Sequence, residues 1–279
     1  MTPRVIVARS CWEVITRELD RVAPREGVLL PLVALDRRSP DADPCAPVGL
    51  RDLAAVVLAE VGCVPPHLQH NGLAHVTALP SADAWADGVV LPLVRRYPRL
   101  RAAAYLHSHP FATAHTWPSG GDIAGHMLPM LRRNTEAGLD ASFSFIACGA
   151  GDGRGWRLPC FAMDARGRVV ELGAAEVVDD DDDAIRRARS RRASRCLLRR
   201  WKHQLHRRGL ALRADELFDG WSRVRVGLGA HHVLVALFPV DFPGAPPRYH
   251  LVDLRTRAAR RLDLEFSVDG TEVLRAEAA

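Results

Sequence analysis

Long apolar segments are missing from this sequence of 279 residues. The longest uncharged apolar run, Val28–Leu35, is far shorter than the roughly 20 residues that a helix needs to cross a bilayer. The first residues, MTPRVIVARSCWEV, also lack the apolar core of a secretory signal. We therefore expect no membrane-spanning helix, no membrane partner and a cytoplasmic protein.

Closely spaced cysteine pairs are absent as well. The six cysteines are scattered, and none forms the Cys-x-x-Cys motif of zinc ribbons or thioredoxin-like sites: Cys11, Cys45, Cys63, Cys148, Cys160 and Cys196. So few cysteines in a chain of this length do not predict a disulfide scaffold. Free, mostly buried thiols in a reducing compartment are the simpler interpretation.

Lysine is almost missing, because Lys202 is the only lysine among 38 basic residues. The formal net charge of +5 comes from one segment: Arg186–Arg208 contains ten arginines, Lys202 and no carboxylate, so the rest of the chain is net negative. A GC-rich genome would explain the choice of arginine. The alternative is that a lysine-poor surface escapes a pathway that attaches proteins to lysine side chains.

The remaining composition, with 48% hydrophobic and 25% charged residues, is typical of a globular protein. Apolar periodicity and turn residues predict helices and strands in mixed order, an α+β chain. The predicted helices are Trp12–Val22, Gly88–Arg96 and Asp122–Arg133, the last kinked at Pro129, and the predicted strands are Val28–Leu35, His75–Leu79, Ala102–Leu106, Phe143–Cys148, Arg157–Met163 and Val169–Leu172. Pro31 cannot donate a ladder hydrogen bond, so we expect it at a sheet edge or a bulge.

Two domains are predicted, separated by an acidic linker. Asp179–Asp183 is an unbroken acidic run, which is typical of a solvated linker. We expect the first domain over 1–176, the linker over 177–184 and a smaller α+β domain over 185–279. The second domain begins with the basic helix Arg186–Arg208 and continues with four strands, on which we expect the helix to pack its apolar stripe of Leu197, Leu198, Trp201 and Leu205.

The segment HSHPFATAHTWPSGGD carries the residues with metal chemistry. Side chains in a strand alternate between faces, so His107 and His109 point the same way and can bind one ion. Asp122 lies at the start of the next helix, where a carboxylate is favoured, and can supply a third ligand. Two histidines and one carboxylate leave one tetrahedral position open for water, which predicts a hydrolytic site with one Zn²⁺ per chain.

Further residues are candidates around this site. Glu26, immediately before the first apolar strand, is the candidate general base. Ser119, just before the helix, can donate a hydrogen bond to a developing oxyanion. His115 is a candidate substrate contact, and His126, one turn after Asp122, is a candidate support for that carboxylate. Each of these two histidines also has a purely structural interpretation, as a loop residue and a helix residue.

In this order the residues resemble the JAMM signature of the MPN/JAB metallopeptidases: a Glu upstream, then His-[Ser/Thr]-His-Pro, then Ser-x-x-Asp. The resemblance covers about residues 10–175 and implies a mixed, cytidine-deaminase-like sheet flanked by helices, an α/β sandwich. It makes His107, His109 and Asp122 the zinc ligands, Glu26 the base that activates water and Ser119 the group that stabilises the tetrahedral intermediate. Family members cleave after the C-terminal Gly of ubiquitin and ubiquitin-like proteins, and bacterial relatives act on ubiquitin-like modifiers or sulfur carriers.

The sequence departs from the family pattern at two places. Nine residues, Pro110–Pro118, separate the second His from Ser119, where the family usually has fewer. Because this loop rims the site, we expect the insertion to alter substrate fit more than metal binding. The strand after Glu26 usually ends in Gly, where this chain has Pro31.

The C-terminal run DFPGAPPRY resembles the Tyr-Pro-x-x-Pro-Pro turn of ubiquitin-conjugating enzymes and their RWD relatives. The catalytic cysteine of conjugating enzymes follows that turn, and no cysteine follows Cys196, so we expect a binding module without transfer activity. A family-specific α+β tail is the alternative. The basic helix could also bind an acidic protein, a nucleic acid or an anionic membrane surface. Nucleic acid ranks last among these, because Trp201 is its only aromatic residue for base stacking.

These features predict a cytoplasmic, bacterial zinc isopeptidase or peptidase that deconjugates or processes a ubiquitin-like modifier. Its expected partners are the modifier or its conjugates, together with activating or conjugating enzymes of the same pathway. The alternative is a non-catalytic MPN scaffold in such a pathway. Metal content distinguishes the two, because only the enzyme requires a bound zinc ion.

Overall fold

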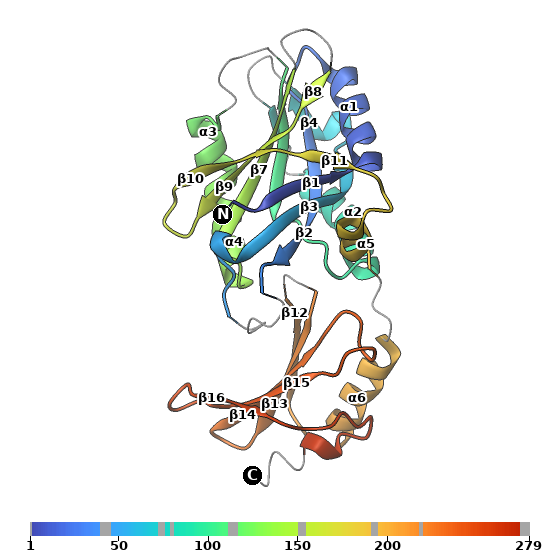
Figure 1. Cartoon of the computed structure of the whole chain (residues 1–279), viewed down its shortest axis with the longest axis vertical. Helices are drawn as coiled ribbons and strands as arrows, with labels where there is room; N and C mark the ends of the chain where they lie inside the picture. The colour runs from blue at the N-terminus through green and yellow to red at the C-terminus, as the bar shows by residue number, and fades with distance from the viewer. Residues whose placement is uncertain are drawn as a thin grey trace. The chain divides into compact units, whose positions relative to one another are not determined.

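The computed structural model describes residues 2–39, 46–71, 76–78, 81–110, 117–149, 155–190, 195–217 and 220–273. The chain divides into two compact units, Met1–Arg189 and Ser190–Ala279 (Figure 1). Among the described residues, no helix is long and apolar enough to cross a membrane. The five cysteines within these ranges are free thiols, and Cys45 lies outside them.

The first unit is built on a nine-stranded mixed sheet in the order β10-β9-β7-β6-β2-β3-β1-β11, with β8 paired to β7. Its strands are β1 (Arg4–Ala8), β2 (Val28–Arg37), β3 (Leu53–Cys63), β6 (Ala104–His109), β7 (Ala141–Gly149), β8 (Trp156–Arg157), β9 (Pro159–Asp164), β10 (Val169–Ala174) and β11 (Glu176–Val178). A separate hairpin contains β4 (Gln69–Asn71) and β5 (Val76–Ala78). The helices are α1 (Arg9–Val22), α2 (Ser81–Arg96), α3 (Gly120–Asp122), α4 (Leu128–Glu136) and α5 (Asp183–Ala188).

Helices lie on both sides of this sheet. In Figure 1, α1, α2 and α5 run along one side of the strands, and α3 and α4 along the other. The central strand β7 is accordingly buried over all but its last residue, and Phe143, Phe145 and Ile146 are fully enclosed. The α+β class expected from the sequence is therefore confirmed, as a large mixed sheet covered by helices.

Pro31 lies in an internal strand, but at a point where its missing N–H costs no ladder bond. The ladder of β2 with β6 contains only Val28↔His107 and Leu29↔Leu106, and contact on this side resumes at the isolated bridge Val33↔Arg101. The register of β2 with β3 also shifts between Leu32 and Val33. A bulge beside Pro31 agrees with the expectation, whereas an edge position does not.

The helix expected over Asp122–Arg133 contains an irregular turn. A π-helical segment, Ile123–Met127, separates α3 from α4, and Pro129 follows as the second residue of α4. Proline cannot donate to the carbonyl four residues earlier, so the wider hydrogen-bond pattern directly before it accommodates the loss. The expected distortion is present, but it lies on the N-terminal side of Pro129.

The acidic run is not the solvated linker that we expected. Residues 176–178 form β11, which pairs with β1. Asp180 accepts hydrogen bonds from the backbone N–H (3.0 Å) and hydroxyl (2.5 Å) of Ser10 at the start of α1, and Asp182 caps α5 by accepting the N–H of Ala184. Carboxylates are favoured at helix N-termini, so these acidic residues fasten two helices to the first unit.

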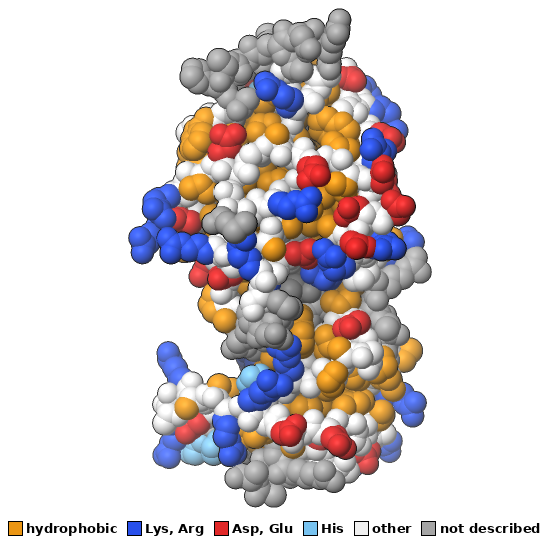
Figure 2. Space-filling model, in the orientation of Figure 1, with side chains coloured by type: hydrophobic (Ala, Val, Ile, Leu, Met, Phe, Trp, Pro, Cys, Tyr) orange, Lys and Arg blue, Asp and Glu red, His pale blue; other side chains and the backbone are white. Residues whose placement is uncertain are grey.

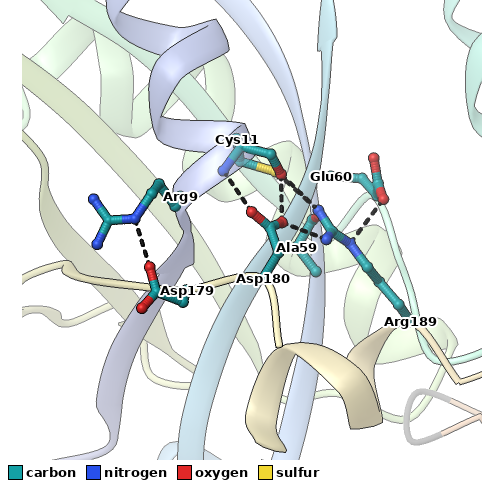
Figure 3. Close-up of polar contacts among 8 residues, drawn as sticks. Arg9, Cys11, Ala59, Glu60, Asp179, Asp180 and Arg189 are labelled. Atoms are coloured by element: carbon teal, nitrogen blue, oxygen red, sulfur yellow. Dashed lines mark hydrogen bonds and ion pairs between the residues drawn. The ribbon is translucent and has the colours of Figure 1, made fainter. Parts of the chain in front are cut away.

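Arg189 completes this attachment at the end of the first unit (Figure 3). Its guanidinium donates to the carbonyl of Ala59 at 2.7 Å and forms ion pairs with Glu60 at 2.9 Å and Asp180 at 2.5 Å. Helix α5 also buries Ala184, Ile185 and Ala188. The first unit therefore extends to Arg189, beyond the boundaries expected at 176 and 184.

The second unit is a five-stranded antiparallel meander with one helix. The strands β12 (Leu212–Glu216), β13 (Ser222–Leu228), β14 (His232–Phe238), β15 (Arg248–Asp253) and β16 (Ala259–Leu262) follow one another in the sheet. The single basic helix expected over Arg186–Arg208 is replaced by α5 in the first unit and α6 (Arg195–Arg207) in the second. Residues 191–194 lie outside the described ranges.

Helix α6 packs its apolar stripe on this sheet, as the sequence predicted. Leu198, Trp201 and Leu205 are buried in one cluster with residues of β13, β14 and β15. The opposite face of α6 is exposed and carries Arg199, Arg200, His203, His206 and Arg207. In contrast, basic and acidic side chains are interspersed on the visible face of the first unit (Figure 2).

Candidate metal centre

Strand β6 brings two imidazoles together at its C-terminal end. His107 and His109 are separated by one residue and therefore share a face of the strand. Their Nε2 atoms lie 3.0 Å apart. His107 is 2% exposed, so one of the two rings is almost completely enclosed by protein.

Asp122 approaches His107 from the beginning of the next helical segment. Ser119 is the N-cap of α3: its hydroxyl accepts the N–H of Asp122 at 3.2 Å, and its own N–H donates to Asp122 Oδ2 at 2.8 Å. This reciprocal cap fixes one carboxylate oxygen. The other oxygen, Oδ1, lies 3.2 Å from His107 Nε2.

The three side chains lie close enough together to hold one metal ion. One donor atom from each of His107, His109 and Asp122 lies within 4.8 Å of the other two. Donors bound at about 2.0–2.1 Å to a tetrahedral zinc ion lie about 3.3 Å apart, close to the two short separations seen here. Two imidazoles and one carboxylate are also ligands that zinc accepts, so the residues fit the ion.

The pKa shifts of His109 and Asp122 favour the forms that bind a cation. Burial lowers the pKa of His109, and His107 lowers it further. Burial by itself raises the pKa of Asp122, but the hydrogen bond and charge of His107, with the two bonds from Ser119, hold that pKa well below its usual value. A neutral imidazole and an ionised carboxylate are the forms that bind a cation.

Glu26 is the buried carboxyl group beside this cluster. It precedes β2 directly and is 7% exposed. Burial raises its pKa; the charge of His107 opposes that shift and the charge of Asp122 adds to it. Glu26 thus lies within electrostatic range of two candidate ligands, and a raised pKa favours a carboxyl group that takes up and releases a proton.

Two side chains hold the backbone that follows Glu26. The N–H of Gly27 donates to Ser108 Oγ at 2.8 Å, and the N–H of Val28 donates to Gln69 Oε1 at 3.2 Å. Gln69 in turn donates to the carbonyl of Val64 at 2.8 Å. The sequence analysis assigned no role to Ser108 or Gln69. In the sequence, the only feature that points to Ser108 is its position between the two histidines, and no feature points to Gln69.

The two additional histidines have different outcomes. His115 lies in 111–116, outside the described residues. His126 stacks on Tyr105, with ring centroids 3.8 Å apart and planes 12° from parallel. Burial lowers the pKa of His126, and His107 and Asp122 influence that pKa in opposite directions. His126 therefore packs on the ring of Tyr105, whereas the hydrogen bonds to Asp122 come from Ser119 and His107.

No model of a protein family matches the sequence, and a search of curated proteins finds no similar sequence.

Proposed function

We propose that this chain is a zinc-dependent peptidase or isopeptidase that cleaves after the C-terminal Gly of a ubiquitin-like modifier. The observation that carries the proposal is the cluster of His107, His109 and Asp122 beside the buried carboxyl group of Glu26. Hydrolysis of an amide is accelerated by a Lewis acid that polarises the carbonyl group and by a side chain that transfers protons. The JAMM-like order of these residues supports the choice of an amide as the bond that is cleaved.

The chemistry divides between the metal and the protein. Zinc held by these three residues would polarise the scissile carbonyl and lower the pKa of water. Glu26 accepts a proton from the attacking water and passes it to the leaving amine, for which a raised pKa is favourable. Ser119 uses its hydroxyl oxygen as an acceptor for Asp122, which leaves its hydrogen available to a developing oxyanion.

For the second unit, we propose a role in binding the substrate or a partner of the same pathway. The DFPGAPPRY segment joins β14 to β15 in the antiparallel meander, and α6 precedes β12. This order of elements supports a module related to ubiquitin-conjugating enzymes. Such a module, lacking a cysteine after Cys196, would bind the modifier, its conjugates or an activating or conjugating enzyme without forming a thioester.

The rival function is a non-catalytic scaffold in the same kind of pathway. Metal analysis and a cleavage assay distinguish the two. The full chain should contain one zinc per molecule and should cleave at least one member of a panel of ubiquitin-like proteins fused through their C-terminal Gly to a fluorophore. Cleavage should stop with a chelator and return with added zinc. A metal-free chain that binds the fusions without cleaving them would establish the scaffold instead.

A further inference from the structure

Ser108 stands between the two candidate ligands of β6 but donates no atom to their cluster. Side chains alternate along a strand, so its hydroxyl faces away from His107 and His109. The residue is 0% exposed. A buried hydroxyl requires a hydrogen-bond partner to offset its loss of water, so the partner indicates what the residue does.

That partner is the backbone of Gly27, which directly follows Glu26. The N–H of Gly27 donates to Ser108 Oγ at 2.8 Å, and the N–H of Ser108 donates to the carbonyl of Gly27 at 2.9 Å. Ser108 therefore binds the N–H of Gly27 through its side chain and the carbonyl of Gly27 through its backbone.

The hydroxyl is needed because the regular ladder ends at this point. The last pair between β2 and β6 is Val28↔His107. In a continuing antiparallel ladder, a backbone carbonyl would accept the N–H of Gly27, but here the Ser108 side chain does so. The other side of Gly27 is also closed, since a Cβ there would lie 2.7 Å from Val22 Cγ2 on α1.

We propose that Ser108 is a positioning residue for Glu26. By fixing the peptide of Gly27, it ties the carboxyl-bearing residue to the same strand that carries His107 and His109, so the base and the ligands move as one unit. This inference rests on the proposed function, in which Glu26 transfers the proton. A positioned acid or base loses much of its effect when displaced by a fraction of a bond length.

The kinetic test compares Ser108→Ala with a matched control in the full chain. Ser144→Ala removes another fully buried serine hydroxyl, from the neighbouring strand β7, and this hydroxyl has no hydrogen-bond partner within the described ranges. We expect Ser108→Ala to lower kcat about 10- to 100-fold with KM unchanged and one zinc still bound, whereas Ser144→Ala cleaves like the wild type. Ser108→Thr, which keeps the hydroxyl, should restore kcat.

A double variant asks whether Ser108 acts through Glu26. Coupled residues give non-additive losses, so Ser108→Ala should cost little further activity in a Glu26→Gln background. The same fold loss in both backgrounds, or a wild-type kcat for Ser108→Ala, would overturn the proposal. If Ser108→Ala does not fold, Ser108→Cys takes its place, because sulfur is a weaker acceptor of similar volume.

A second measurement does not depend on catalysis. Hydrogen exchange at the Gly27 amide in the metal-free chain should accelerate at least about 10-fold in Ser108→Ala and stay unchanged in Ser144→Ala, because only the first variant removes its acceptor. If exchange at Gly27 is unchanged in both variants, Ser108 does not hold the Gly27 amide. If the wild type cleaves nothing, the proposed function fails, while this exchange measurement still decides whether Ser108 holds Gly27.

Discussion

At the candidate metal centre, burial shifts the pKa values of His109 and Glu26 in opposite directions. Burial and His107 keep His109 neutral to a lower pH than an exposed histidine, by lowering its pKa. Burial acts in the opposite direction on Glu26, whose raised pKa keeps it protonated to a higher pH than an exposed glutamate. Burial thus favours the neutral form of His109, which can bind a cation, and the protonated form of Glu26, which can donate a proton.

His109→Ala should remove most of the bound zinc, since His107 and Asp122 alone hold the ion poorly. Elemental analysis of the purified variant measures the loss. His203→Ala, which removes an exposed histidine from α6, is the matched control and should keep one zinc per chain. Unchanged zinc in His109→Ala would show that the site is wrongly assigned.

Glu26→Gln should keep zinc but lower kcat by about 10²–10⁴-fold, because the amide has nearly the same shape and cannot accept the proton. In the wild type, activity should fall as the pH drops through the pKa of Glu26, which burial places above that of an exposed glutamate. Rate measurements across pH test both statements. Glu13→Gln, an exposed change on α1, should have no effect. Near-wild-type turnover in Glu26→Gln would eliminate Glu26 as the base.

At the scale of elements, several helix ends are held by residues that lie far away in the sequence. Ser10 at the start of α1 is bonded to Asp180, and the Arg189 guanidinium links Asp180 to β3 through Ala59 and Glu60. Asp180 also accepts the backbone N–H of Ser10, one of the groups at the start of α1 that the helix cannot satisfy internally. The acidic run could be recognised in the sequence, but its hydrogen bonds to α1 depend on which helix end lies beside it in the fold.

Asp180→Asn should lower the free energy of unfolding at neutral pH by about 1 kcal/mol, a small value because Asp180 is 40% exposed and water screens its charge. Although burial opposes the shift, bonds from Ser10 and Arg189 lower the pKa of Asp180 in the folded chain. Its contribution is therefore present above the unfolded-state pKa and is lost as the pH falls through the folded-state value. Denaturant unfolding at several pH values measures this.

The control for that experiment is Asp181→Asn, which changes the neighbouring exposed carboxylate of the same run. It should leave stability unchanged. Equal effects of the two substitutions would mean that the net charge of the run matters and not the bonds to Ser10 and Arg189.

At the scale of the whole molecule, the end of the first unit determines which fragment can fold alone. Residues 177–189 contribute most of β11, the buried face of α5 and Arg189 to that unit. The second unit has a core of its own, built around Trp201, Phe238 and Tyr249. Each unit therefore buries enough apolar surface to be considered separately.

A chain ending at Ser190 should fold, bind zinc and cleave a small generic substrate. A chain ending at Glu176 should aggregate or melt at least about 5 °C lower, because it exposes the apolar surface that α5 covers. Thermal melting and zinc content test this pair. With a natural conjugate, the chain ending at Ser190 should show a raised KM more than a lowered kcat, since the second unit would supply binding remote from the reacting bond.

If α6 supplies part of that binding, its exposed basic face makes the affinity of the full chain fall as salt increases, while kcat does not change. Equal KM values for the full chain and the chain ending at Ser190 would show that the second unit does not take part in substrate binding. Loss of folding in the chain ending at Ser190 would contradict the division into two units.

Short-range patterns in the sequence determined the parts of this protein that depend on a few neighbouring residues. Alternation along a strand placed His107 and His109 on one face, Ser119 and Asp122 form a local helix cap, and helical spacing identified the buried stripe of α6. Only the tertiary structure brought Gly27, and with it Glu26, to Ser108 at a separation of 81 positions, and attached the acidic run to α1. These contacts depend on which strands pair and in what register, and strand pairing across long stretches of chain leaves no local period in the sequence.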